Sequence, residues 1–229
     1  MGTVRVIGAG PLGRDIASML AAGSVVSKLY LADRSPTDPT TYPGAPFAPT
    51  SAEALRDLLR ANEPRPGSRR IQAVSHWSKP DGARVDLTVV VTGQVEPDRA
   101  ITEHLIRDDL PHLVVRLDGA VARVGPLVVP GRTACLNCLD LVTTSEQPGW
   151  PDRLLAASRT IARHGDRLLG PWTSSMAALQ VHSYLRSSAT GRVAADTVGC
   201  TVELDLDDGL TRVRRWPLHP DCGCHWSLG

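Results

Sequence analysis

The first third of the chain alternates short apolar runs with a segment of helical periodicity. Residues 4–7 form a run rich in β-branched side chains that stops at a glycine, which is typical of a buried strand in a parallel sheet. Apolar residues at helical spacing then predict a helix that ends near Gly23, and residues 28–32 form the next strand. The order strand, helix, strand predicts a β-α-β unit at the start of the chain.

The same two periodicities continue through the rest of the sequence. They predict helices at residues 51–60, 100–106, 153–164 and 174–185, the first with Ser51 as its cap, and strands at residues 71–74, 85–91 and 113–117. Residues 35–50 hold five prolines and are expected to form a stiff surface loop. Two short pieces, 120–124 and 127–129, look like a hairpin around Gly125-Pro126, and residues 201–205 and 211–216 like another.

This order predicts an α/β fold with a Rossmann-like, mostly parallel sheet flanked by helices and a C-terminal antiparallel portion. We expect residues 1–229 to form one domain. Within it, residues 1–118 would be the nucleotide-binding half and residues 119–229 a metal-clamped half that binds a partner or substrate.

Three glycines follow the first strand in the G-x-G-x-x-G spacing. Gly8 would permit a tight turn, Gly10 would let a phosphate approach the backbone, and Gly13 would let the helix pack closely on the strand. Asp33 ends the second strand, where a carboxylate could accept hydrogen bonds from ribose hydroxyls. The spacing therefore predicts nucleotide-binding geometry, although the glycine motif alone does not show that a nucleotide binds.

Charge and length narrow the possible partners. The formal net charge is +1, so no whole-molecule field favours nucleic acid or an acidic membrane surface. No apolar run reaches the length that a bilayer requires, and the chain leads directly into its first strand. We expect a cytoplasmic protein with no nucleic acid or membrane partner.

Four of the five cysteines occur in two close pairs. Cys135 and Cys138 form a C-x-x-C knuckle, and Cys222 and Cys224 form a C-x-C pair near the end of the sequence. In a reducing compartment such pairs indicate metal or thiol chemistry rather than disulfides. Two thiolate pairs in turns rich in glycine or proline suit a tetrahedral zinc site with four cysteine ligands, and a closed site of this kind is structural.

Other interpretations of the cysteines stay open at this point. The pairs could be surface thiols or a redox pair, and because C-x-C is tighter than C-x-x-C, His219 or His225 could replace one thiolate. Cys200 stands alone on an expected strand and is predicted to be a small buried hydrophobic residue.

Seven segments, in order along nearly the whole chain, carry a family resemblance: GAGPLG, LYLAD, SAEALRDLLR, DLTVVVTG, VGPLVVPGRTACLNCL, LLGPWTSSMAALQ and HPDCGC. Together they resemble the ThiF/MoeB superfamily, the adenylating enzymes related to ubiquitin-activating enzymes. The resemblance implies a Rossmann-like sheet with a zinc clamp, usually in a homodimer. It also implies adenylation of the C-terminal carboxylate of a peptide or small carrier protein with ATP and Mg²⁺, with phosphates over the glycine loop and the ribose on Asp33.

The sequence departs from the family where the family carries charge. The Asn and Arg that hold phosphate after the second strand have no counterpart in residues 35–50, Ser51 stands where the family has a lysine, and Gly93 where it has an aspartate that organises Mg²⁺ and ATP. Arg14 and Arg34 could compensate in part, or could be ordinary surface arginines. Because phosphoryl and adenylyl transfer depend on charge stabilisation, these losses predict reduced or absent adenylation.

Three functions remain on this basis. The first is a degenerate ThiF-like accessory subunit that binds a peptide, a small carrier protein or a second modifying enzyme. It would resemble the partners of cyclodehydratases that modify peptides, although such partners usually carry an extra N-terminal peptide-binding domain. The second is an active adenylyltransferase. The third, an NAD(P)-dependent oxidoreductase, is supported only by the glycine loop and Asp33.

Overall fold

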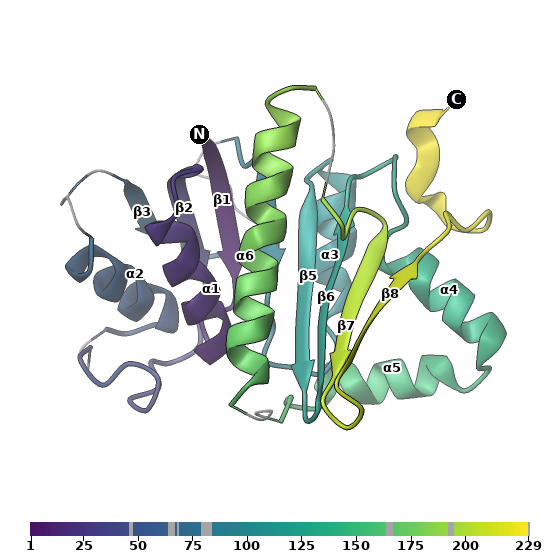
Figure 1. Ribbon diagram of the computed structural model, residues 1–229, viewed down its shortest axis with the longest axis horizontal. Coiled ribbons are helices and arrows are strands. Elements are labelled where there is room, and N and C mark those ends of the chain that lie inside the picture. The colour runs from purple at the N-terminus through teal and green to yellow at the C-terminus, as the bar shows by residue number, and fades with distance from the viewer. Residues whose placement is uncertain are drawn as a thin grey trace.

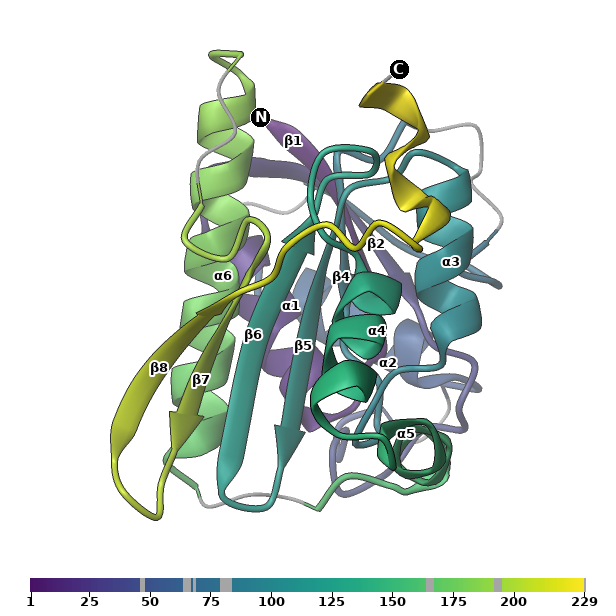
Figure 2. The same cartoon turned by 90° about the vertical axis from the view of Figure 1, so that its right-hand side faces the viewer.

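The computed structural model describes residues 1–45, 48–63, 67, 69–78, 84–163, 167–191 and 195–228. They form one eight-stranded sheet with helices on both faces, in the strand order β3-β2-β1-β4-β5-β6-β7-β8 (Figures 1 and 2). The strands are β1 (Gly2–Ile7), β2 (Val26–Ala32), β3 (Arg70–Ala73), β4 (Leu87–Val90), β5 (His112–Asp118), β6 (Val121–Val128), β7 (Cys200–Asp205) and β8 (Leu210–Arg215). The sheet is continuous across residue 118, because β5 pairs with β6.

Helices α1 and α6 pack together on one face of the sheet, and α3 and α4 lie on the other (Figures 1 and 2). The helices are α1 (Pro11–Ala22), α2 (Ser51–Ala61), α3 (Arg99–Arg107), α4 (Leu136–Glu146), α5 (Trp150–Arg159) and α6 (Leu169–Ser188), with a 3-10 turn η1 (Gly223–Leu228) near the C-terminus. None of the helices in these described ranges is long and apolar enough to cross a membrane.

The parallel half of the sheet contains the predicted β-α-β unit. β1 pairs in parallel with β2 and with β4, so that Val6 aligns with Leu31 and with Val89. All three side chains are buried in the main core, together with Ile16 of α1 and Leu55 of α2. Burial on both faces explains why these strands read as continuous apolar runs. The predicted mostly parallel α/β architecture is confirmed.

The antiparallel half begins at β6, and here one prediction was wrong. The pieces 120–124 and 127–129 do not pair with each other, since both belong to β6, which runs between β5 and β7. Gly125 has φ of +105°, and a Cβ there would lie 2.2 Å from the carbonyl oxygen of Cys200, so glycine is required for this close approach. Gly125 and Pro126 fall in a register shift opposite Val114, a bulge in which the missing proline N–H costs no ladder bond. The hairpin of β7 and β8 is as predicted.

Several helix boundaries also differ from the predictions. α4 was not expected, α5 occupies Trp150–Arg159 rather than residues 153–164, and residue 164 lies outside the described residues. α6 begins at Leu169, earlier than expected, and includes a proline in its first turn, where no intrahelical N–H bond is lost. The cap of α2 is Thr50 and not Ser51, because the Thr50 hydroxyl accepts a hydrogen bond from the Glu53 amide and donates one to the Glu53 carboxylate.

Candidate functional site

The glycine loop lies between β1 and α1, and its three glycines differ in the space around them. A Cβ at Gly8 would lie 1.8 Å from the Val91 carbonyl oxygen, and one at Gly13 would lie 2.1 Å from the Gly8 carbonyl oxygen. These two glycines are therefore required for packing. Gly10 is exposed, and a Cβ there would meet no atom of the described chain within 4 Å. The backbone at the N-terminus of α1 is thus open at Gly10, in a position where anions bind.

Asp33 holds the glycine loop against the end of β2. Its Oδ2 accepts a hydrogen bond of 2.7 Å from the Ala9 amide, and its Oδ1 accepts one of 2.9 Å from the Ser35 amide. A carboxylate oxygen can accept a second bond, so Asp33 could also accept from a ribose. The neighbouring Arg34 is exposed and makes no hydrogen bond or ion pair with the residues that the structure describes.

The proline-rich loop folds back onto the glycine loop. The buried Tyr42 donates a hydrogen bond from its hydroxyl to the Ala9 carbonyl, and burial raises the Tyr42 pKa, so the phenol stays neutral. Arg14 donates from Nη1 to the Thr41 carbonyl at 3.1 Å and from Nε to Asp15 at 2.9 Å. The two loops are joined at these points, and the Arg14 guanidinium is already engaged.

The two positions at which the sequence departs from the family carry no charge in the structure. Ser51 is buried at the start of α2, and its hydroxyl donates to the Pro36 carbonyl at 3.1 Å. Gly93 is exposed after β4, and its carbonyl accepts a hydrogen bond of 2.9 Å from the Ala162 amide. A Cβ at Gly93 would meet no described atom within 4 Å, so this position has room for a side chain.

A buried ionic network fixes the segment that follows β4. Glu96 accepts hydrogen bonds from Arg116 at 2.7 Å and from Arg99 at 3.1 Å, and Arg99 continues to Asp140 at 2.7 Å. Trp150 donates its indole N–H to the same Asp140 at 3.0 Å. Burial alone would raise the Glu96 pKa, but the two guanidinium groups outweigh it and lower the pKa. The network joins β5, α3, α4 and α5 at one point.

Sequence analysis did not predict this network. Its members come from four different elements between residues 96 and 150, and their contacts follow from the fold alone. The available signal was Arg116, a charge inside an otherwise apolar strand, since such residues are rarely buried unless they are paired.

The four predicted metal ligands converge. The Sγ atoms of Cys135, Cys138, Cys222 and Cys224 all lie within 4.8 Å of one another, and all four residues are buried. Three of the separations are 3.4, 3.6 and 4.0 Å. Ligands at 2.3 Å from a tetrahedral zinc would be about 3.8 Å apart, whereas a disulfide would need about 2.05 Å. The cluster therefore has the spacing of a metal site and could hold a metal ion.

Local structure favours a thiolate at Cys138. The pKa of Cys135 is raised by its hydrogen bond to Cys138 and by burial, and the pKa of Cys224 is raised by burial. Cys135 is the N-cap of α4 and Cys138 lies in its first turn, where the helix dipole stabilises negative charge. The Cys135 thiol and the His219 amide both donate to Cys138, which lowers the pKa of Cys138. His219 thus approaches through its backbone, and the four thiols converge without a histidine ligand. Nδ1 of His225 is buried without a hydrogen-bond partner in the described chain.

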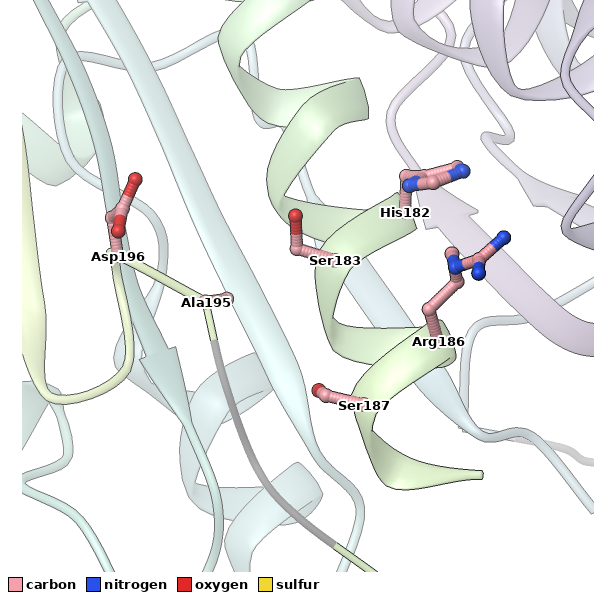
Figure 3. Close-up of a pocket in the computed structure, with 6 residues that line it drawn as sticks. All are labelled: His182, Ser183, Arg186, Ser187, Ala195 and Asp196. Atoms are coloured by element: carbon pink, nitrogen blue, oxygen red, sulfur yellow. The ribbon is translucent and has the colours of Figure 1, made fainter. Parts of the chain in front are cut away.

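A polar hollow of about 540 Å³ lies elsewhere, along the C-terminal part of α6. Figure 3 shows Ser183 and Ser187 turned toward Asp196, while His182 and Arg186 point to the other side of the helix. The adjacent Leu185 contacts the start of β1, so this hollow lies at the edge of the parallel strands opposite the glycine loop. It contributes nothing to the candidate nucleotide site.

Comparison with known proteins finds similarity at the level of fold. No family model matches the sequence, and no curated protein matches it. E. coli MccB with a form of MccA superposes with a TM-score of 0.73 at 16% identity over 98% of this chain and 66% of that one. E. coli MccB with ATP gives 0.71 at 14% identity over 97% and 66%, and PaaA gives 0.67 at 17% identity over 94% and 73%. The chain spans 66% of these MccB structures, and the predicted resemblance to the ThiF/MoeB superfamily is confirmed for the fold.

Proposed function

We propose, from the fold shared with MccB, that this chain is a ThiF-like accessory subunit with reduced adenylation activity. It would bind a peptide, a small carrier protein or a second modifying enzyme in the course of peptide or sulfur-carrier modification. The observation that carries the proposal is the state of the glycine loop. Tyr42 and Arg14 bind it to the proline-rich loop, and Ser51 and Gly93 bring no charge to it.

The structural neighbours support a peptide partner. E. coli MccB has been solved with MccA, and one structure describes MccB as the biosynthetic enzyme of microcin C7, in complex with N-formylated MccA. The present chain has the same fold but spans 66% of those structures, so their activity and partners are transferred here only as a proposal. We propose in addition that the protein is a cytoplasmic homodimer in which residues 119–229 form the partner-binding half.

The second candidate is an active adenylyltransferase. Gly10 favours it, because the open backbone at the N-terminus of α1 could still receive phosphates, and MccB has been solved with ATP. In that reaction a peptide carboxylate would attack the α-phosphate of ATP and release pyrophosphate. The site residues for this candidate are Gly8, Gly10, Gly13 and Asp33, with Arg14 and Arg34 in place of the family's charged residues and Mg²⁺ supplied from solution.

We propose zinc as the ion of the cysteine cluster, because four thiolates in a tetrahedral arrangement are its typical structural donor set. Cys135, Cys138, Cys222 and Cys224 would hold it, and its part would be to tie α4 to the C-terminal segment. The NAD(P)-dependent oxidoreductase is the weakest candidate, since the glycine loop and Asp33 remain its only support.

Two measurements on purified protein separate the first two candidates. Calorimetric titration with ATP and Mg²⁺ reports nucleotide binding. Exchange of labelled pyrophosphate into ATP, measured in the presence of candidate peptides with a free C-terminal carboxylate, reports adenylation. We expect weak binding and little or no exchange. Gly10→Val is the control, because it fills the open position without strain at φ of −66° and should abolish any binding at the loop.

Gly93→Asp restores the missing family carboxylate where the structure has room for it. We expect it to strengthen Mg²⁺-dependent binding of ATP. Rapid exchange by the unmodified protein that Gly10→Val abolishes would overturn the accessory role and establish the adenylyltransferase.

A further inference from the structure

β8 is an unpaired edge of the sheet. Among the described strands it pairs with β7 alone and is last in the strand order (Figures 1 and 2). All six of its residues are exposed. An exposed edge strand of this length is a template for pairing with another chain. The opposite edge, β3, has four residues.

The register with β7 shows which backbone groups are open. The Trp216 amide donates to the Gly199 carbonyl, directly beyond the pair formed by Arg215 and Cys200. Bonded and non-bonded pairs alternate in an antiparallel ladder, so Arg212 and Arg214 bond to β7. The N–H and C=O groups of Thr211, Val213 and Arg215 therefore point away from the sheet, in the spacing that an added strand requires.

The side chains of β8 differ between the two faces. Val213 aligns with Val202 and through it with Val124, so it lies on the face covered by α6, together with Thr211 and Arg215. Arg212 and Arg214 lie on the face of α4, where Arg214 contacts Glu146 at 2.7 Å. Arg212 is likewise paired with Asp208. The side chains of both arginines are nearly half exposed, and exposed ion pairs of this kind contribute little to stability, so both guanidinium groups remain accessible to the carboxylates of a partner.

We propose that β8 binds an extended acidic segment of a protein partner by strand addition. Carboxylates on one face of that segment would lie beside Arg212 and Arg214, and apolar β-branched side chains on its other face beside Val213. A second copy of this chain fits less well. Pairing β8 with itself would bring the three arginines of each strand together, and like charges on adjacent strands are destabilising.

This inference rests on the proposed function, because it names the class of partner that the accessory subunit would bind. The probe is a fluorescent hexapeptide of alternating glutamate and valine, and the matching peptide of lysine and valine is its control. Anisotropy should report binding of the acidic peptide that weakens as salt is added. Amide exchange followed by NMR should show Thr211, Val213 and Arg215 becoming protected when the peptide binds, while Arg212 and Arg214 are protected from the start.

Val213→Pro tests the mechanism, because it removes an outward N–H and no bond to β7. Val213→Pro should weaken binding of the acidic peptide about fivefold relative to Val213→Ala, which keeps the N–H. Absence of binding, or equal binding of the lysine peptide, would overturn the inference. So would a dimer that Val213→Pro converts to a monomer, since the occupant would then be a second copy. Binding without protection of the β8 amides would overturn it too, but would leave the proposed function standing.

Discussion

Removal of the metal from the cysteine cluster should destabilise the whole fold. The cluster joins Cys135 to Cys222, which are 87 residues apart, so a bound ion closes a long loop. In the chain-entropy treatment a cross-link that closes such a loop stabilises by about 4.6 kcal/mol at 25 °C. For a chain of 229 residues the entropy of unfolding is about 0.5 kcal/mol/K, so the melting temperature should fall by about 10 °C.

The assay compares melting temperature with metal content. Protein purified without added chelator should carry one zinc ion per chain by elemental analysis, and dialysis against a strong chelator should remove it. Cys138→Ala should lose the metal and melt at the lower temperature. Cys200→Ala is the matched control, because it also removes a buried thiol but one outside the cluster, and this variant should keep the metal. A Cys138→Ala protein with its full metal content, or a metal-free protein of unchanged stability, would refute the reasoning.

Three further predictions concern the glycine loop and the buried network. Gly13→Ala should unfold the protein or greatly destabilise it in a thermal melt, because its Cβ would meet the Gly8 carbonyl at 2.1 Å, whereas Gly10→Ala should melt like the unmodified protein. Tyr42→Phe should cost about 1 kcal/mol in urea denaturation, since a buried carbonyl loses its donor, and no change would show that the bond is unimportant. The lowered pKa of Glu96 contributes stability that is present above the ordinary pKa of 4.5 and lost as the pH falls through the folded value. Glu96→Gln should therefore cost about 3 to 5 kcal/mol at pH 7 and flatten the acid side of the stability profile, which urea titrations across pH would measure.

The β-α-β unit was predictable because local pattern determines it. Apolar runs, a helical period and glycines at fixed spacing all indicate the same structure, and the core formed by β1, α1 and β2 follows from them. The convergence of the four cysteines was predictable for a similar reason, since closely spaced cysteine pairs suit a shared metal site.

The remaining features depend on distant contacts. α4 contains Val142, Thr143 and Thr144, which are poor helix formers, and its weak apolar period gave no signal. Its first turn is held instead by the cysteine cluster, whose second pair comes from the other end of the chain. Gly125-Pro126 suggested a break between strands, and only the neighbouring β7 shows why the chain continues through it as a bulge.

At the candidate site, sequence located the residues but not their contacts. Arg14 and Asp33 stand where they were expected, yet each is already bound by backbone groups of the adjoining loops. The bond to Arg14 depends on the conformation of the proline-rich loop. That loop has no periodic sequence pattern, so its conformation could not be predicted from the sequence.

The strand pairings of the sheet differ in the length of chain that each must close, and both the parallel and the antiparallel half contain a short and a long closure. β5 meets β6, and β7 meets β8, across short turns, while β1 meets β4 only after more than eighty residues, as in the bond between Thr3 and Asp86. Loop closure costs entropy before a contact forms, so the hairpins should become protected earlier during refolding than the centre of the parallel sheet. Pulse labelling of backbone amides with deuterium would show this order. The hairpin of β7 and β8, whose edge strand we assign to a partner, would form before β4 pairs with β1 beside the glycine loop.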